Sequence, residues 1–181
     1  MRALTRVIFA MSILLLASPA FAVTLNFSDV VPQNLNELPF YGSVQKTPEM
    51  LAVDERLKTE ATKAAGSAEN AAAYAAVKAW EAFHNMKLNE AMRRANQAWL
   101  LDNNNFNAYW AMAIIQLFRG APKDEVDDLF EKALATVDSD NKARLAQDYE
   151  NFLKGGENHP VENLAQIAEH YQQAQKALLG K

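Results

Sequence analysis

The chain has 181 residues, 22 acidic and 18 basic side chains, a formal net charge of −4, and no cysteine. The missing cysteines exclude disulfides and thiolate metal sites, and the acidic balance argues against a surface for nucleic acid or anionic lipid. Alanine is abundant, whereas glycine and proline number six each and fall mostly between helical segments, so we expect an all-α protein.

Residues 1–22 have the three parts of a secretory signal peptide. Two arginines and no acid precede an apolar run from Val7 to Ala17, and the segment ends in Ala20-Phe21-Ala22. The run is short for a hydrocarbon core of ~30 Å, and an uncleaved membrane anchor is the alternative. No cysteine follows it, which excludes a lipid-modified cysteine. We therefore predict cleavage after Ala22, a periplasmic location and no stable membrane insertion of the mature chain.

Residues 23–181 remain after that cleavage, and they suffice for one domain of ordinary size. Removal of the leader takes away two of the 18 basic residues and no acidic one, so the mature chain is more acidic. A domain of ~150 residues buries about 68–70% of its unfolded surface, so a core without disulfides is feasible.

Residues 23–46 show no helical period, and we interpret them as an extended N-terminal arm that precedes a helical domain at 47–181. Eight large apolar side chains are scattered along the arm: Leu25, Phe27, Val30, Val31, Leu35, Leu38, Phe40 and Tyr41. Two alternatives follow. The arm is a disordered leader, or its Leu38-Pro39-Phe40-Tyr41 segment docks on the helical body near the first helix pair, since free tails seldom carry so many large apolar residues.

Apolar residues that recur at intervals of three and four predict a series of helices in residues 47–181. We expect them at Pro48 to about Ala65, Ala68 to Asn85, Glu90 to Leu101, Asn105 to Phe118, Lys123 to Val137, Asn141 to Lys154 and Pro160 to Leu179. Thr47 and Asn89 are expected N-caps. The first helix should bury Met50, Leu51, Val53 and Leu57, and the fourth is apolar nearly all round, which places it at the centre of the domain.

The stretch from Ala91 to Ala113 carries a recognisable pattern. Small residues at Ala91 and Ala98 precede Trp99-Leu100-Leu101-Asp102, an asparagine-rich corner at 103–105, and Ala108-Tyr109. This pattern resembles the junction between two tetratricopeptide repeats. The resemblance departs from the family at Asn103, where the consensus has proline, and at Lys78, where it has a small residue.

Membership of this family would imply a right-handed superhelical array of antiparallel helix pairs. Equivalent residues lie 35 positions apart, Ala91 with Val126 and Ala98 with Ala133, which gives two clear repeats at about 72–105 and 106–140. The helices at 141–154 and 160–179 would form a degenerate third pair, with the last helix as a solvated cap. Ala98 should sit in a tight helix–helix contact. A plain antiparallel bundle is the alternative fold.

The resemblance implies a protein–protein or peptide interaction module without catalytic activity, because the first helix of each repeat pair lines a concave groove. Carried over, the groove candidates are Trp80, Phe83 and His84 in the first pair and Asn107 and Trp110 in the second. Any of these side chains could instead be core, as we expect for Ile114 and Phe118. The rival function is a helical-bundle enzyme or a small-ligand carrier of the cell envelope.

No motif nominates catalysis, a cofactor or a metal site. Glu81-x-x-His84 has the spacing of half a di-iron carboxylate site, but Ile167 stands where the second half would need glutamate before His170. The stretch that starts at Asp138 resembles a calcium loop but lacks its glycine and its final glutamate. No nucleophile–base pair and no phosphate-binding glycine loop is present. We expect no metal, no cofactor and no catalytic residue.

Overall fold

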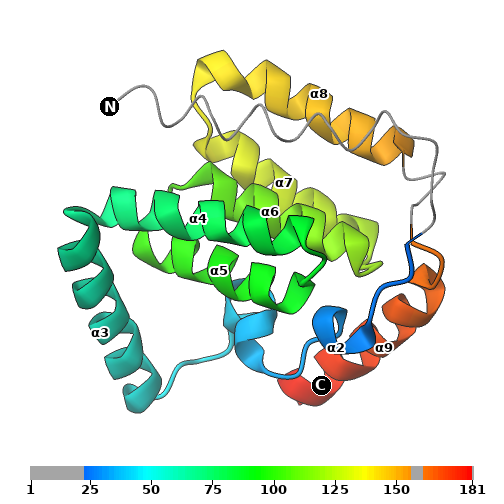
Figure 1. Cartoon of the computed structure of the whole chain (residues 1–181), viewed down its shortest axis with the longest axis horizontal. Helices are drawn as coiled ribbons and strands as arrows, with labels where there is room; N and C mark the ends of the chain where they lie inside the picture. The colour runs from blue at the N-terminus through cyan, green and yellow to red at the C-terminus, as the bar shows by residue number, and fades with distance from the viewer. Residues whose placement is uncertain (1–22, 156–160, 181) are drawn as a thin grey trace.

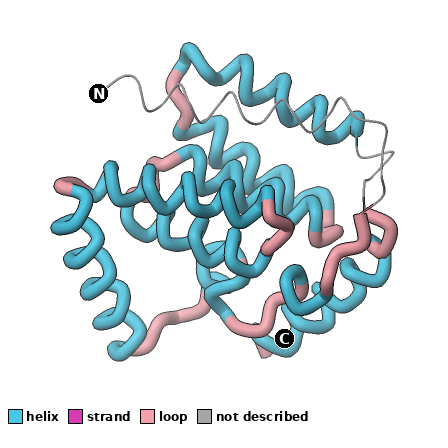
Figure 2. The backbone as a smooth tube through the Cα atoms, viewed as in Figure 1, coloured by secondary structure: helices cyan, strands magenta, loops and turns pink. Residues whose placement is uncertain are grey.

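The computed structural model describes residues 23–155 and 161–180, and these form an all-helical protein, as predicted (Figures 1 and 2). The described helices are α2 (Phe27–Val30), η2 (Leu35–Glu37), η3 (Pro39–Ser43), α3 (Pro48–Ala65), α4 (Ala68–His84), α5 (Leu88–Leu101), α6 (Phe106–Phe118), α7 (Lys123–Thr136), α8 (Ser139–Gly155) and α9 (Leu164–Leu179). The predicted signal peptide, its last residue Ala22 and His159 lie outside the described residues.

Side-chain caps fix several helix starts. The Thr47 hydroxyl accepts the Met50 N–H, the Ser67 hydroxyl accepts the Asn70 N–H, and the Asn105 side chain accepts the Asn107 N–H. Asn89 is not a cap as expected, because α5 begins two residues earlier than expected, at Leu88, and buries Asn89 inside the helix.

Two consecutive helical hairpins, α4–α5 and α6–α7, form the body of the protein (Figure 1). Ten of the thirteen residues of α6 are buried, so the nearly all-apolar helix is the centre of the domain, as expected. Ala98 is fully buried among Ala75 and Ala76 of α4 and Ala108 of α6. Small side chains therefore let the two hairpins approach closely.

The expected third pair does not form. The helix α8 packs on α7, whereas α9 lies well away from α8 and packs against α2 (Figure 1). A parallel bridge joins Val23 to Val161, and the Asn163 side chain bonds both the N–H and the carbonyl of Leu25. These contacts draw α9 to the start of the arm and away from its sequence neighbour.

The arm at 23–46 is not extended, and it belongs to the core. It forms α2, η2 and η3, three helical turns that are each too short to produce a period in the sequence. Leu25, Val30, Val31 and Leu38 are buried. The Leu38–Tyr41 segment docks on the body, where the Phe40 ring lies 5.1 Å from that of Trp99 on α5.

The expectation for α3 is wrong, because none of its residues is buried. Leu51 is 51% exposed and Val53 is 54% exposed. The helix projects from the body at an angle to α4 (Figure 1). The turns η2 and η3 of the arm contact α5, whereas α3 contacts the body mainly through α4.

Candidate interaction surface

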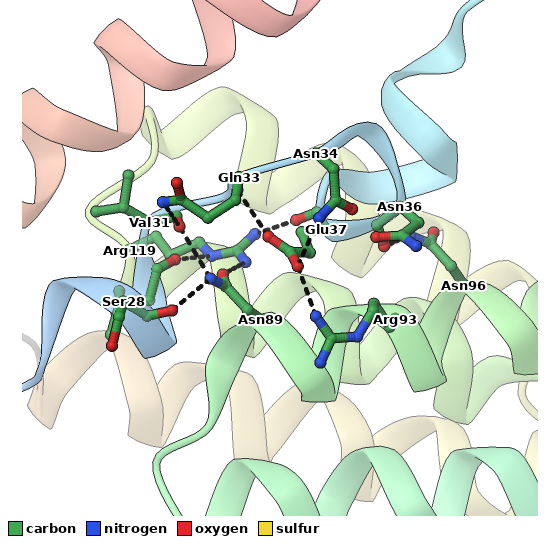
Figure 3. Close-up of polar contacts among 11 residues, drawn as sticks. Ser28, Val31, Gln33, Asn34, Asn36, Glu37, Asn89, Arg93, Asn96 and Arg119 are labelled. Carbon is green, nitrogen blue, oxygen red and sulfur yellow. Dashed lines mark hydrogen bonds and ion pairs between the residues drawn. The ribbon is translucent and has the colours of Figure 1, made fainter.

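The arm is held by a buried polar network centred on Arg119, the residue that ends α6 (Figure 3). The fully buried guanidinium donates to the carbonyls of Val30 at 2.9 Å and Glu37 at 2.7 Å, and to the Asn89 side chain at 2.7 Å. Burial lowers the pKa of Arg119 to about 10, so it stays charged at neutral pH. The buried charge of Arg119 is thus stabilised by hydrogen bonds to main-chain carbonyls of the arm.

Two asparagines on α5 bind the arm in the same way, through its main chain. The Asn89 amide donates to the carbonyls of Ser28 and Val31 at 3.0 and 2.9 Å, and the Asn96 amide donates to those of Asn36 and Leu38 at 2.9 and 2.8 Å (Figure 3). These asparagines stand seven residues apart on one face of the helix. The face recognises main-chain groups rather than particular side chains.

One ion pair completes the network. The buried Glu37 carboxylate accepts from Arg93 at 2.5 Å and from the Gln33 N–H at 2.7 Å. Sequence reasoning missed this whole network. The available signal was two polar residues, Asn89 and Asn96, at positions where α5 is otherwise alanine and methionine. We assign the network a structural role, because its hydrogen bonds hold the arm and Arg119, Asn89, Asn96 and Glu37 line neither of the clefts described below.

The arm ends in a turn of left-handed backbone. Phe40, Tyr41, Gly42 and Ser43 have φ values of 53°, 56°, 70° and 53°. Left-handed conformation costs non-glycine residues roughly 1–2 kcal/mol each, so the surrounding packing must hold this turn in place. Gly42 leaves room for α9, since a Cβ at this position would lie 2.8 Å from the Leu179 side chain of that helix.

An open cleft lies between this turn, α3 and the body, and we call it the aromatic cleft. It has a volume of about 580 Å³ and is lined by Phe40, Ser43, Val44, Lys46, Leu51, Trp99, Tyr109 and Lys132. The ring of Phe40 packs edge-on to Trp99 and lies 5.9 Å from the ring of Tyr109. Leu51 is the contribution of α3, and half of its surface is still open to solvent.

The charged groups that line the aromatic cleft are both lysines. Lys46 forms an ion pair with Asp54 of α3, and its ammonium lies 4.0 Å from the centre of the Tyr41 ring. Lys132 donates only a long bond of 3.4 Å to the Asp128 carbonyl, and it has no carboxylate partner among the described residues. Lys132 is therefore available to an anionic group of a ligand.

A second and smaller cleft, which we call the polar cleft, adjoins the first. It has a volume of about 200 Å³ and shares Phe40, Ser43 and Lys132 with the aromatic cleft, while its other walls include Gln116, Glu125, Asp128, Gln175 and Leu179. Gln116 is fully buried and donates to the Tyr171 hydroxyl. Burial raises the pKa of the Glu125 carboxyl.

None of the groove candidates from the sequence lines either cleft. Phe83 and Trp110 are core residues that pack on Phe118 and Phe130, respectively, so they offer no surface to a partner. Ile114 and Phe118 are core as well. Trp80, His84 and Asn107 are half-buried, and the Trp80 ring lies 5.7 Å from that of Phe83. The cleft residues Phe40, Leu51 and Trp99 were not among the candidates.

Sequence reasoning missed the aromatic cleft because of how it is assembled. Four of its lining residues come from the arm and the linker that follows it, where the sequence has no period from which a surface could be inferred. The signal was present in Phe40 of the arm and Trp99 of the repeat pattern, two large aromatic residues whose contact joins distant parts of the sequence.

The acidic motifs have ordinary structural roles. Glu81 pairs with Lys78 at 2.5 Å, and the Asp138 carboxylate accepts the Asn141 N–H at 3.0 Å as a helix cap. Within residues 23–155 and 161–180, no three His, Cys, Asp or Glu side chains gather in a way that could hold a metal ion. In the same part of the chain, no helix has both the length and the apolarity to cross a bilayer.

The protein is all-α and built on helical hairpins, and it has an open, largely apolar cleft beside the projecting helix α3. Comparisons with models of protein families, with curated proteins and with solved structures give no match for this chain.

Proposed function

We propose that this protein is an exported interaction module, built on tetratricopeptide-like helix pairs, that binds a segment of another protein without catalysis. The observation that carries the proposal is α3, an 18-residue helix with no buried residue that forms one wall of the aromatic cleft. A helix gains most of its stability from packing an apolar face. A bound segment would supply the packing that α3 lacks.

The composition of the cleft supports a protein ligand. Partly exposed aromatic rings surrounded by charged and polar groups are typical of the anchor sites at which a partner inserts a bulky side chain. The side chains of Phe40, Trp99 and Leu51 supply such a site, and the lysines at its edge supply polar contacts. A peptide or an amphipathic helix can lie along α3 and place one anchor in the cleft.

The periplasm remains the proposed location, because residues 1–22 have the pattern of a secretory signal peptide. Intact-mass measurement of the exported protein should give the mass of residues 23–181. A mass that includes Met1 would contradict cleavage after Ala22 and favour the uncleaved anchor.

Affinity capture with matched variants tests the binding function. Leu51 and Val53 lie on the same helix with nearly equal exposure, but only Leu51 lines the aromatic cleft. Leu51→Asp should abolish capture of a specific envelope protein, whereas Val53→Asp should leave it intact. Equal capture by both variants would reject the aromatic cleft as the binding site.

A small-ligand carrier is the second candidate, and the polar cleft is the observation that favours it. A fully buried Gln116 side chain at the wall of a cavity is a group that could orient a small polar molecule. Native mass spectrometry of the protein purified from envelope extract separates the two functions. A bound small molecule supports a carrier, and a bound polypeptide supports an interaction module.

A further inference from the structure

The charges around the two clefts have an order that constrains the ligand. From the aromatic cleft, the surface passes Lys132, which lines both clefts, and reaches Glu125 and Asp128 in the polar cleft. The sequence of chemical environments is therefore apolar, cationic and anionic.

We propose that the two clefts together bind one peptide segment whose residues run in the complementary order, a bulky apolar residue, then an acidic residue, then a basic residue. This inference rests on the proposed function and names the class of ligand for that site. The apolar side chain lies among Phe40, Trp99 and Leu51, and the acidic side chain pairs with Lys132.

The remaining cation of the aromatic cleft does not compete for the acidic residue. Lys46 is already paired with Asp54, and both side chains are largely covered. Lys132 is solvent-exposed and bonds only a main-chain carbonyl, so an incoming carboxylate breaks no existing ion pair. Pairs at an exposed rim contribute modestly to affinity, but they select the partner and its direction.

The third position follows from the carboxylates of the polar cleft. Asp128 is exposed and lies one helical turn before Lys132 on α7. A basic residue that follows the acidic one meets Asp128 and Glu125 there. The same residue placed in the aromatic cleft would meet the unpaired Lys132 and no carboxylate among the lining residues, so the reversed peptide is disfavoured by like charges.

Selection from a phage-displayed random peptide library on the purified protein tests the order. Peptides that the Leu51→Asp variant also retains are removed first. We expect the remaining sequences to carry an aromatic residue or leucine, followed by aspartate or glutamate and then by lysine or arginine.

Titration of a selected peptide, acetylated and amidated at its ends, tests the role of Lys132. Lys132→Glu should weaken binding by about tenfold, and the peptide with lysine in place of its acidic residue should recover affinity for that variant. Lys142→Glu makes the same charge change on α8, which lines neither cleft, and should leave affinity within about twofold. Thermal melts establish that each variant is folded.

The outcomes separate this inference from the proposed function. Selected peptides that depend on Leu51 but lack the acidic residue, or that bind Lys132→Glu as tightly as the unmodified protein, overturn the charge order and leave the interaction module intact. Binding that requires a free carboxyl terminus on the peptide overturns the inference that the ligand is an internal segment of a chain. A library without any peptide that depends on Leu51 contradicts both the inference and the proposed function.

Discussion

Arg119 is the residue on which the attachment of the arm depends most. Its side chain is fully buried and reaches two carbonyls of the arm, the side chain of Asn89 on α5, and the Gln116 side chain of its own helix at 3.2 Å. The Tyr171 ring of α9 lies 5.8 Å from the guanidinium carbon. One side chain therefore touches the arm, two body helices and the last helix.

Replacement of Arg119 by methionine should lower the free energy of unfolding by about 3–5 kcal/mol, because it leaves buried carbonyls without a donor. Urea denaturation measures the loss. Arg94→Met is the control, since Arg94 lies on the partly exposed face of α5 and pairs with Glu90 at 3.6 Å. A loss as small as that of the control would contradict the role assigned to Arg119.

Glu125 gives stability a dependence on pH. Burial raises the pKa of its carboxyl in the folded protein, so the folded state binds that proton more tightly than the unfolded state. Stability therefore rises as pH falls through the raised pKa toward the unfolded value of about 4.3. Glu125→Gln should raise the melting temperature at pH 7 and lose that advantage near pH 4. Glu131→Gln, on the exposed side of α7, should change little at either pH.

At the scale of the element, α9 approaches the turn after α6 closely at a glycine. Gly120, in the turn after α6, has a φ of 65°, and a Cβ there would lie 2.7 Å from the Cβ of Ala168. Gly66 has a similar φ of 81° but nothing within 4 Å of its Cβ position. The two glycines share a backbone requirement and differ in whether a helix lies against them.

Gly66→Ala should therefore cost only the backbone strain, about 1–2 kcal/mol. Gly120→Ala should cost about 1–3 kcal/mol more, because it also pushes α9 away from α6. Chemical denaturation of both variants measures the difference. Equal losses would mean that α9 is not held against this turn.

Ala98 tests the packing between the hairpins. It is fully buried among three other alanines, so Ala98→Leu should destabilise the protein by about 1–3 kcal/mol through overpacking. A thermal melt measures the effect, with Ala64→Leu on the exposed side of α3 as the control. An unchanged melting temperature would contradict close approach of the helices at this point.

The two hairpins could be predicted from the sequence, and the elements around them could not. Helices α4 to α7 each carry an apolar stripe long enough to show a period, and Ala91 and Ala98 are buried like their counterparts Val126 and Ala133. Turns such as η2 and η3 are too short for a period. The position of α9 depends on contacts with the start of the arm, which lies far from it in the sequence. The aromatic cleft was missed for that same reason.

In the whole molecule, stability does not follow the length of the elements. No residue of the long helix α3 is fully buried, while the short turns of the arm are held by buried side chains of α5 and by Arg119 at the end of α6. Opening of local structure requires little free energy where few apolar contacts are broken.

Hydrogen exchange should show this difference directly. Amides of the arm at 35–41 should exchange almost as slowly as those of α6, whereas the amides in the middle of α3 should exchange much faster. Exchange of the arm amides at the random-coil rate would contradict the docked arm. A bound peptide of the proposed class should slow exchange in α3 and leave α6 unchanged.

The bridge between Val23 and Val161 places a constraint on how the protein is made. The hydrogen bond from Thr24 to Glu162 closes a loop of 138 residues, and long-range contacts of this kind form late and slow the folding of a chain. A polypeptide that emerges amino end first presents the arm before the helices that receive it. The helices α5 and α6 can cover most of the arm as soon as they emerge, whereas the start of the arm lacks its partners until Val161 and Asn163 have followed. We therefore expect the apolar side chain of Leu25 to stay uncovered, and open to aggregation, for longer than the rest of the arm.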